Sequence, residues 1–366
     1  MIPLFKVYMN PIVNESLLKV LHSGWVGQCS KTDEFEKALS KRVDNPRCLS
    51  LSAGTHGIHL ALRLLNIRSN DEVISTPLTC TATNMPILMQ GADIVWADIN
   101  PTDLNIDPLS IKEKITRNTK AIIAVHWGGY PCDMADIYEI AKEHNIAVIE
   151  DAAHAFGATL YNTRIGDCRY SDFVMFSFQA IKHLTCVDGG ALLFKDDNYY
   201  KRGKLLRWYG IDREGTRKDL RCEEDIKEYG YKYHMNDVNA TIGLSNLQKV
   251  DGLISTGKQN AAYYNSELAG ISGIELLQKN PQKESSYWLY TILVEDRSGF
   301  SRLMGEEGIM VSRVHERNDK HTCFRKYKEQ LPNLESVTHK MICIPVGWWV
   351  SKEDREYIVN TIKKGW

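Results

Sequence analysis

Long hydrophobic runs are missing from this 366-residue chain, and their absence is the first constraint on its class. No stretch approaches the roughly 18 uninterrupted apolar residues that a membrane-spanning helix needs. The longest runs, such as Ala121–Val125, have the length of a strand. The N-terminus shows no cationic segment followed by an apolar run, so we expect no signal peptide. These features predict a cytoplasmic protein with no membrane partner.

A surplus of charge of either sign is missing too. The 45 Lys and Arg residues nearly balance the 46 Asp and Glu residues, which gives a formal net charge of −1. A dedicated nucleic-acid binder usually carries a basic surplus, so we expect no nucleic-acid partner. The nine cysteines include no Cys-x-x-Cys pair. Their odd number indicates reduced thiols rather than disulfides, and we expect no metal site.

What the chain does contain, from about residue 47 to 195, is an alternation of short apolar runs with amphipathic stretches. Helical patterns such as Ile58–Leu65 and Met134–Glu143 separate the runs. This alternation predicts an α/β fold with a mostly parallel central sheet flanked by helices. The strand candidates are Cys48–Leu51, Glu72–Ser75, Ile94–Ala97, Ala121–Val125, Ala147–Ile149, Phe173–Phe178 and Ala191–Phe194.

The length suggests roughly two domains at about 150 residues each. We place a large domain at residues 1–250 and a smaller C-terminal α/β domain at residues 251–366. Residues 197–280 are charged and read as largely helical. The expected elements of the small domain are Tyr287–Val294, Phe300–Met304, Met310–Val314 and a helix from Lys352.

Ligands of a parallel sheet bind outside the carboxyl ends of its strands, so the residues that follow each strand carry the chemistry. The first strand runs into a small, flexible turn that contains Gly54, Thr55 and His56, and a helical pattern begins at once. Free backbone N–H groups at a helix N-terminus suit a phosphate, although a plain turn capped by Thr55 is the alternative. The turn matches neither the dinucleotide nor the nucleotide-triphosphate glycine pattern.

Two acids, Glu150 and Asp151, end a later strand, and Lys182 follows Ser177 by five residues. The acids are compatible with a metal site, an acid/base pair, a partner for a cationic ligand, or an exposed pair. Because neighbouring residues on a strand point to opposite faces, we expect only one of the two acids to face a ligand pocket. A lysine beside an apolar strand end would be partly desolvated, which favours a reactive amine, whereas most lysines are exposed. Pyridoxal phosphate needs an amine, an acid for its ring nitrogen and a phosphate cradle, and these segments supply all three.

Three motifs carry a resemblance to a known family. They are Ser52-x-Gly-Thr55, Glu150-Asp-Ala-Ala-His154-Ala-Phe-Gly-Ala, and Phe176-Ser-Phe-Gln-x-x-Lys182-x-x-Thr-x-x-x-Gly-Gly190. They are similar to those of the DegT/DnrJ/EryC1/StrS aminotransferases, and the likeness covers nearly the whole chain. It implies a fold-type I, pyridoxal-phosphate-dependent transferase that cycles through pyridoxamine phosphate. It also implies glutamate and a keto-sugar nucleotide as substrates, and a homodimer with shared active sites.

The resemblance also assigns roles residue by residue. Lys182 looks like the lysine that binds the cofactor covalently and moves the proton, and Asp151 like the acid on the pyridine nitrogen. His154 stands near the ring hydroxyl. The phosphate would be held by Thr55, the His56 amide and Ser177, on a turn that begins with Gly54.

At three places the chain departs from the family pattern. Cys80 stands where an aromatic ring usually covers the cofactor, so either Cys80 or Trp127 would face the ring. Lys232 replaces an Asn that reaches the cofactor phosphate of the neighbouring subunit, and a surface lysine is the alternative reading. Arg313, His315 and Arg317 alternate along a strand-like run, so we expect them to share one face and to receive a sugar or diphosphate.

The resulting hypothesis is transfer of an amino group from glutamate to a keto-sugar nucleotide, with a 4-keto-6-deoxyhexose favoured, for lipopolysaccharide or a related glycan. The alternatives are a 3-keto-sugar aminotransferase, a pyridoxamine-phosphate-dependent sugar dehydratase, and a non-catalytic pyridoxal-phosphate-binding regulator. Family dehydratases have His in place of the lysine, and His183 directly follows Lys182. The spacing from Ser177 to Lys182 places the lysine at the family position, which favours transamination. The nucleotide carrier stays open among UDP, dTDP and GDP.

Overall fold

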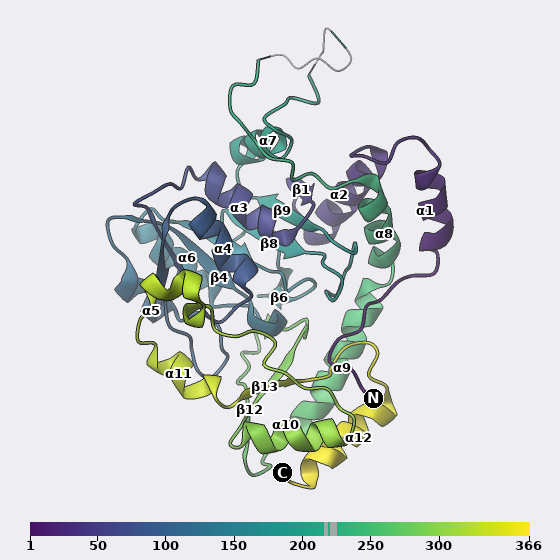
Figure 1. Cartoon of the computed structure of the whole chain (residues 1–366), viewed down its shortest axis with the longest axis vertical. Coiled ribbons are helices and arrows are strands. Elements are labelled where there is room, and N and C mark those ends of the chain that lie inside the picture. Colours follow the sequence, from purple (N-terminus) through teal and green to yellow (C-terminus); the bar gives the residue numbers. More distant parts are fainter. Residues whose placement is uncertain (216–218, 220–224) are drawn as a thin grey trace.

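A computed structural model describes residues 1–215, 219 and 225–366 (Figure 1). Its centre is a seven-stranded sheet in which β9 alone runs antiparallel to its neighbours β1 and β8, while the other pairs are parallel. The strand order is β1 (Cys48–Leu51), β9 (Gly190–Phe194), β8 (Phe173–Ser177), β5 (Ala147–Asp151), β4 (Thr119–Val125), β2 (Glu72–Ser75) and β3 (Asp93–Trp96). The predicted α/β class and all seven predicted strands are confirmed.

Helices cover both faces of this sheet because side chains alternate along each strand. Ile123 of β4 belongs to one buried cluster, and its neighbours Ile122 and Ala124 belong to another. The first cluster includes residues of α3 (Gly54–Leu64), α4 (Thr81–Met89) and α7 (Asp197–Leu206). The second includes residues of α2 (Ser30–Val43), α5 (Pro108–Lys114), α6 (Met134–Glu143), α8 (Asp237–Leu247) and α9 (Val250–Glu267).

The C-terminal part is built on a three-stranded antiparallel sheet, β10 (Ile274–Leu276), β12 (Tyr290–Val294) and β13 (Met341–Ile344). The long helix α9 reaches from the central sheet down to this part (Figure 1). A separate buried cluster joins α9 to α10 (Arg297–Glu306) and α12 (Lys352–Lys363). The domain boundary near residue 250 stays a prediction.

The remaining elements are short. They are α1 (Val13–Leu21), η1 (Trp127–Gly129), η2 (Asn318–Lys320), η3 (Thr322–Tyr327), α11 (Pro332–Thr338), and the small sheet of β6 (Thr159–Leu160), β7 (Thr163–Arg164) and β11 (Lys283–Glu284). In the described part of the chain, no helix is both long enough and apolar enough to cross a membrane.

Two predictions for the C-terminal half are wrong in detail. Residues 310–314 form no strand, because Val314 has a φ of 68° and only Ser312 forms a bridge, to Cys343. Residues 197–280 are only partly helical, since the described residues between α7 and α8 run mostly without helix. The sequence reasoning also missed β13, whose four buried residues pair with β12.

Candidate active site

Lys182 lies in the loop that joins β8 to β9. This loop needs no crossover helix because the two strands are antiparallel, so it stays at the carboxyl end of β8. Two asparagines of α8 fix its far side. Asn239 donates hydrogen bonds to the carbonyls of Cys186 (2.7 Å) and Asp188 (2.8 Å), and Asn246 donates one to Thr185 (2.8 Å). The loop is therefore held from outside and presents Lys182 to the centre of the molecule.

The amine of Lys182 is set in an unusual environment. Burial lowers the pKa of Lys182 to about 7, although Asp151 and Cys80 oppose this shift. A substantial fraction of the amine is thus neutral, and nucleophilic, at neutral pH. The adjacent His183 points elsewhere, because its Nε2 lies 2.9 Å from the carbonyl oxygen of Ser286. Lys182, and not His183, is the residue that faces Asp151.

The two acids at the end of β5 do point to opposite faces, as alternation along a strand requires. Glu150 lies 2.9 Å from His126 Nε2 and accepts a hydrogen bond from Ser171 (2.5 Å). Asp151 instead accepts hydrogen bonds from Thr83 Oγ1 (2.6 Å) and the Ala153 amide (3.1 Å), and burial raises its pKa. Only Asp151 belongs with Lys182.

Thr83 is a site residue that the sequence reasoning missed. It lies in the first turn of α4, and its hydroxyl also contacts that of Thr79 (2.8 Å). Cys80 stands immediately before this helix and is partly buried. The threonine-rich run at residues 76–83 was a signal for such hydroxyl contacts.

The turn before α3 is a close-packed cradle. A Cβ added at Gly54 would lie 2.9 Å from Met175 Sδ and 3.0 Å from Ser177 Cβ. One added at Gly190 would lie 2.7 Å from the Gly54 nitrogen. Small residues therefore bring Ser177 and the N-terminus of α3 together, and that terminus presents free backbone N–H groups together with Thr55 and His56.

His56 is tied down by the segment that precedes α8. Its ring stacks on Tyr233 with centroids 4.0 Å apart, and its Nδ1 lies 2.9 Å from Ser52 Oγ. Lys232, next to Tyr233, is exposed and bridges to Trp208 through its backbone. Its predicted reach toward a neighbouring subunit stays a prediction.

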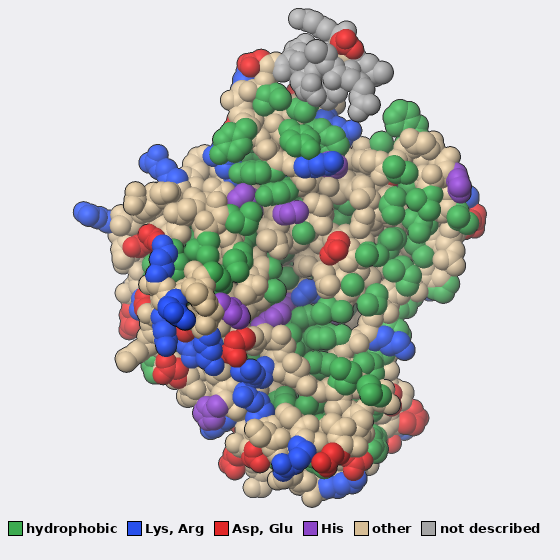
Figure 2. Space-filling model, in the orientation of Figure 1, with side chains coloured by type: hydrophobic (Ala, Val, Ile, Leu, Met, Phe, Trp, Pro, Cys, Tyr) green, Lys and Arg blue, Asp and Glu red, His purple; other side chains and the backbone are tan. Residues whose placement is uncertain are grey.

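A cage of aromatic rings surrounds the remaining side of the site. The ring of His154 stacks on Trp288 (3.9 Å between centroids) and lies parallel to that of His315 (5.8 Å), and Trp127 meets both imidazoles edge-on. Burial lowers the pKa of His315 to about 4 and that of His154 well below its usual value, so both are neutral. Figure 2 shows histidine side chains gathered in the hollow between the upper and lower halves.

The prediction that Arg313, His315 and Arg317 share one face is wrong. The positive φ of Val314 interrupts the alternation between them. Only His315 meets the cage. Arg317 is buried and forms a bidentate pair with Asp319 (2.7 and 2.6 Å), and Arg313 pairs with Glu316 at 3.0 Å.

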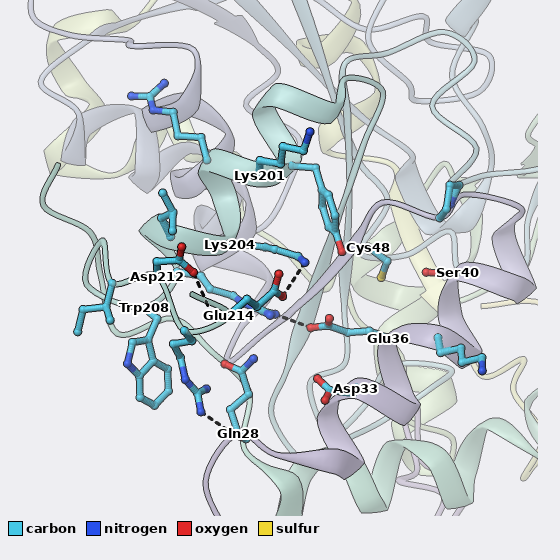
Figure 3. Close-up of a pocket in the computed structure, with 18 of the residues that line it drawn as sticks. Gln28, Asp33, Glu36, Ser40, Cys48, Lys201, Lys204, Trp208, Asp212 and Glu214 are labelled. Atoms are coloured by element: carbon cyan, nitrogen blue, oxygen red, sulfur yellow. Dashed lines mark hydrogen bonds and ion pairs between the residues drawn. The ribbon is translucent and has the colours of Figure 1, made fainter. Parts of the chain in front are cut away.

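A surface hollow of about 1270 Å³ lies away from Lys182, between α2 and α7 (Figure 3). Its charged side chains pair with one another, as Arg207 does with Glu36 and Lys204 does with Glu214 (2.7 Å). It holds none of the residues that the sequence singled out for catalysis. Size alone does not mark the active site here.

The residues around Lys182 fit pyridoxal phosphate. His154 Nδ1 and His315 Nε2 are buried without a hydrogen-bond partner, which leaves two polar atoms for a bound group to satisfy. Asp151 offers a carboxylate, Lys182 an amine, and Gly54 marks a cradle that a Cβ would fill.

Comparison with known proteins identifies the family of the chain. Residues 9–363 match the profile of the DegT/DnrJ/EryC1/StrS aminotransferase family. AtS13 of Actinomadura melliaura is 46% identical, with a TM-score of 0.96 over 100% of this chain and 99% of the other. The sugar aminotransferase CalS13 of Micromonospora echinospora is 40% identical, with a TM-score of 0.96 over 100% of both chains.

Spr1654 of Streptococcus pneumoniae, known in PLP and PMP forms, is similar as well. It is 27% identical in the PMP form, with a TM-score of 0.93 over 100% of this chain and 98% of the other. The family match spans nearly the whole chain. This protein is a pyridoxal-phosphate-dependent aminotransferase and belongs to the DegT/DnrJ/EryC1/StrS family.

Proposed function

We propose that this enzyme transfers an amino group from glutamate to carbon 4 of a nucleotide-linked 4-keto-6-deoxyhexose. The product is an amino sugar for lipopolysaccharide or a related glycan. The observation that carries the proposal is the half-buried Lys182 amine beside Asp151, in a chain 40% identical to a sugar aminotransferase. The choice of sugar and of donor rests on the family resemblance.

The chain's own residues supply the proton chemistry. Bound pyridoxal phosphate provides an aldehyde for amine exchange and a ring that accepts electrons. Lys182 Nζ takes a proton from the α-carbon of the donor and later returns one to the sugar carbon, because a pKa of about 7 lets it serve as both base and acid. The Asp151 carboxylate, held by Thr83, binds the ring nitrogen and keeps it protonated.

The neutral histidines orient the bound ligands. His154 and His315 each keep one buried nitrogen without a hydrogen-bond partner, so they can donate or accept hydrogen bonds without adding charge. Trp127, Trp288 and the two imidazoles exclude water from this side, which strengthens the electrostatic contacts of Asp151.

We also propose a cytoplasmic homodimer in which Lys232 reaches the phosphate in the partner's site. Apolar side chains are exposed along the N-terminal segment and α1, among them Ile12 (53%), Leu18 (57%) and Trp25 (72%). Figure 2 shows such side chains gathered over α1 and α8. Patches of this kind mark protein–protein contacts in soluble proteins.

The first experiment is an absorption spectrum with pyridoxal phosphate, before and after glutamate. We expect a visible band that glutamate bleaches and that Lys182→Ala does not form by itself. The pyridoxamine-phosphate form is then supplied with 4-keto and 3-keto sugar nucleotides on UDP, dTDP and GDP, and product mass is followed. Turnover of 3-keto sugars alone contradicts the carbon-4 assignment, and loss of a sugar hydroxyl without amination indicates the dehydratase.

A mixing experiment tests the shared site. Lys182→Ala and Lys232→Ala are each expected to be nearly inactive. If Lys232 acts across the interface, a heterodimer of the two contains one intact site, so random mixing restores about a quarter of wild-type activity. No recovery, with heterodimers present by native mass spectrometry, contradicts the shared site.

A further inference from the structure

Trp288 is the closest aromatic neighbour of the reactive amine. Lys182 Nζ lies 3.5 Å from the centroid of the Trp288 ring. The indole Nε1 donates a 2.9 Å hydrogen bond to the carbonyl of Ile181, the residue before the lysine. One side chain therefore contacts both the amine and the backbone that carries it.

The Trp288 ring has little freedom to move away. It is 6% exposed, and Phe5 stacks on it with centroids 5.1 Å apart, in addition to His154 at 3.9 Å. Packing by Phe5 of the N-terminal segment and by His154 of the segment that follows β5 thus fixes the ring beside the amine. A fixed aromatic face attracts an ammonium group through its quadrupole, and more strongly when water is excluded.

The other groups around the amine do not already hold it in place. Within the described residues, Asp151 is the one carboxylate that acts on Lys182, and Cys80 adds a smaller effect. The imidazoles of His154, His183 and His315 also interact electrostatically with the amine, but burial lowers the pKa of each, so none bears a charge at neutral pH. Asp151 itself is committed to the ring nitrogen once the cofactor is bound.

We propose that Trp288 is a positioning residue that holds the amine of Lys182 on its ring face whenever that amine is not bonded to the cofactor. This inference rests on the proposed aminotransferase function. The released amine stays on the Trp288 face beside the reacting carbon. It does not swing across the small cavity that Lys182 and Trp288 themselves line, toward Lys6 and Trp348 on its other side. The aromatic face favours the ammonium form, so it also sets how readily Lys182 gives up its proton.

Competitive acetylation tests the proposal, because acetic anhydride modifies only neutral amines. The enzyme is labelled between pH 5 and 9 in its pyridoxamine-phosphate form and without cofactor, and the Lys182 peptide is quantified by mass spectrometry. For Trp288→Leu we expect the midpoint of Lys182 labelling to fall by about one pH unit, since the cation–π contact is lost. Trp288→Phe keeps an aromatic face and is expected to stay near wild type.

Two further variants make the result decisive. Trp348→Leu is the matched control, because Trp348 lines the same cavity but its ring lies below Lys6 Nζ, at 5.5 Å. Its midpoint is expected to match wild type. A ring-fluorinated tryptophan placed only at position 288 keeps the size and the N–H group of the side chain but weakens the attraction of the ring face for a cation. The midpoint of Lys182 labelling should therefore fall as fluorine atoms are added. This series decides the question if Trp288→Leu fails to fold.

An unchanged midpoint in the fluorinated series, or an equal fall in Trp348→Leu, overturns the proposal. The failure of the proposed function looks different: wild type would then form no visible band with pyridoxal phosphate. The labelling midpoints without cofactor remain readable in that case, so the two failures are separable.

Discussion

Thr83 and Asp151 share a 2.6 Å hydrogen bond from hydroxyl to carboxylate, although 68 residues separate them in the chain. α4 supplies the hydroxyl and β5 supplies the acid. The carboxylate is thus oriented before any ligand arrives. Burial of the carboxylate raises the pKa of Asp151, and the hydrogen bond from Thr83 opposes part of this shift.

Asp151→Asn is expected to stabilise the cofactor-free protein while strongly lowering the activity of the enzyme. The raised pKa means that the folded state binds a proton more tightly than the unfolded state, so stability falls as the pH rises from about 4 through the folded pKa. Removing the charge should therefore raise stability at pH 7.5 by about 1 kcal/mol. Activity should fall by about a hundredfold, because the ring nitrogen loses its anion.

Urea unfolding at pH 7.5 and pH 4.5, together with the cofactor spectrum, checks this expectation. The stability gain should shrink at the lower pH, where the wild-type carboxyl is protonated more often. Glu150→Gln is the matched control, on the same strand but facing His126 and Ser171. A stability gain in Glu150→Gln instead, or full activity in Asp151→Asn, would contradict the assignment.

The buried histidines should make the cofactor-free protein acid-sensitive. His183 and His315 have pKa values lowered to about 4, and that of His154 is also lowered. In the unfolded chain these groups titrate near pH 6.5. Stability contributed by the neutral rings is complete above that pH and is lost as the pH falls toward about 4, at about 1.4 kcal/mol per pH unit for each ring.

His315→Gln tests this sign directly. Between pH 6.5 and 5 the slope of unfolding free energy against pH should flatten by about 1.4 kcal/mol per unit relative to wild type. His144→Gln, an exposed position, should leave the slope as it is. Equal slopes for His315→Gln and wild type would show that the His315 ring titrates normally in the folded protein.

Arg317 and Arg313 are expected to respond differently to replacement by alanine. Arg317→Ala leaves the buried Asp319 without its bidentate partner and should cost about 3–5 kcal/mol of stability. Arg313→Ala breaks a half-exposed pair with Glu316 and should cost less than about 1 kcal/mol. Melting curves distinguish the two, and a raised KM for the sugar nucleotide in Arg313→Ala alone would support a substrate contact there. Comparable stability losses would contradict the structural role given to Arg317.

Much of this site was predictable because the chemistry lies in short local patterns. The β8–β9 loop with Lys182, the end of β5 with Asp151 and the turn with Gly54 are each readable from neighbouring residues. The alternation of side chains along a strand also predicted that Asp151 and Glu150 point to opposite faces of the sheet. The strand-like reading of residues 311–317 failed because the left-handed conformation of Val314 has no signature in that sequence.

Local sequence patterns were enough to predict the α/β class, the family resemblance and the three segments of the candidate site. The packing of distant segments added Thr83 from α4 and Trp288 before β12, and it brought only His315 of the three predicted substrate residues to the site. The sequence could not predict these contacts because they join side chains that lie far apart in the chain. Their meeting depends on how the C-terminal part packs against the central sheet, and no local periodicity records that packing.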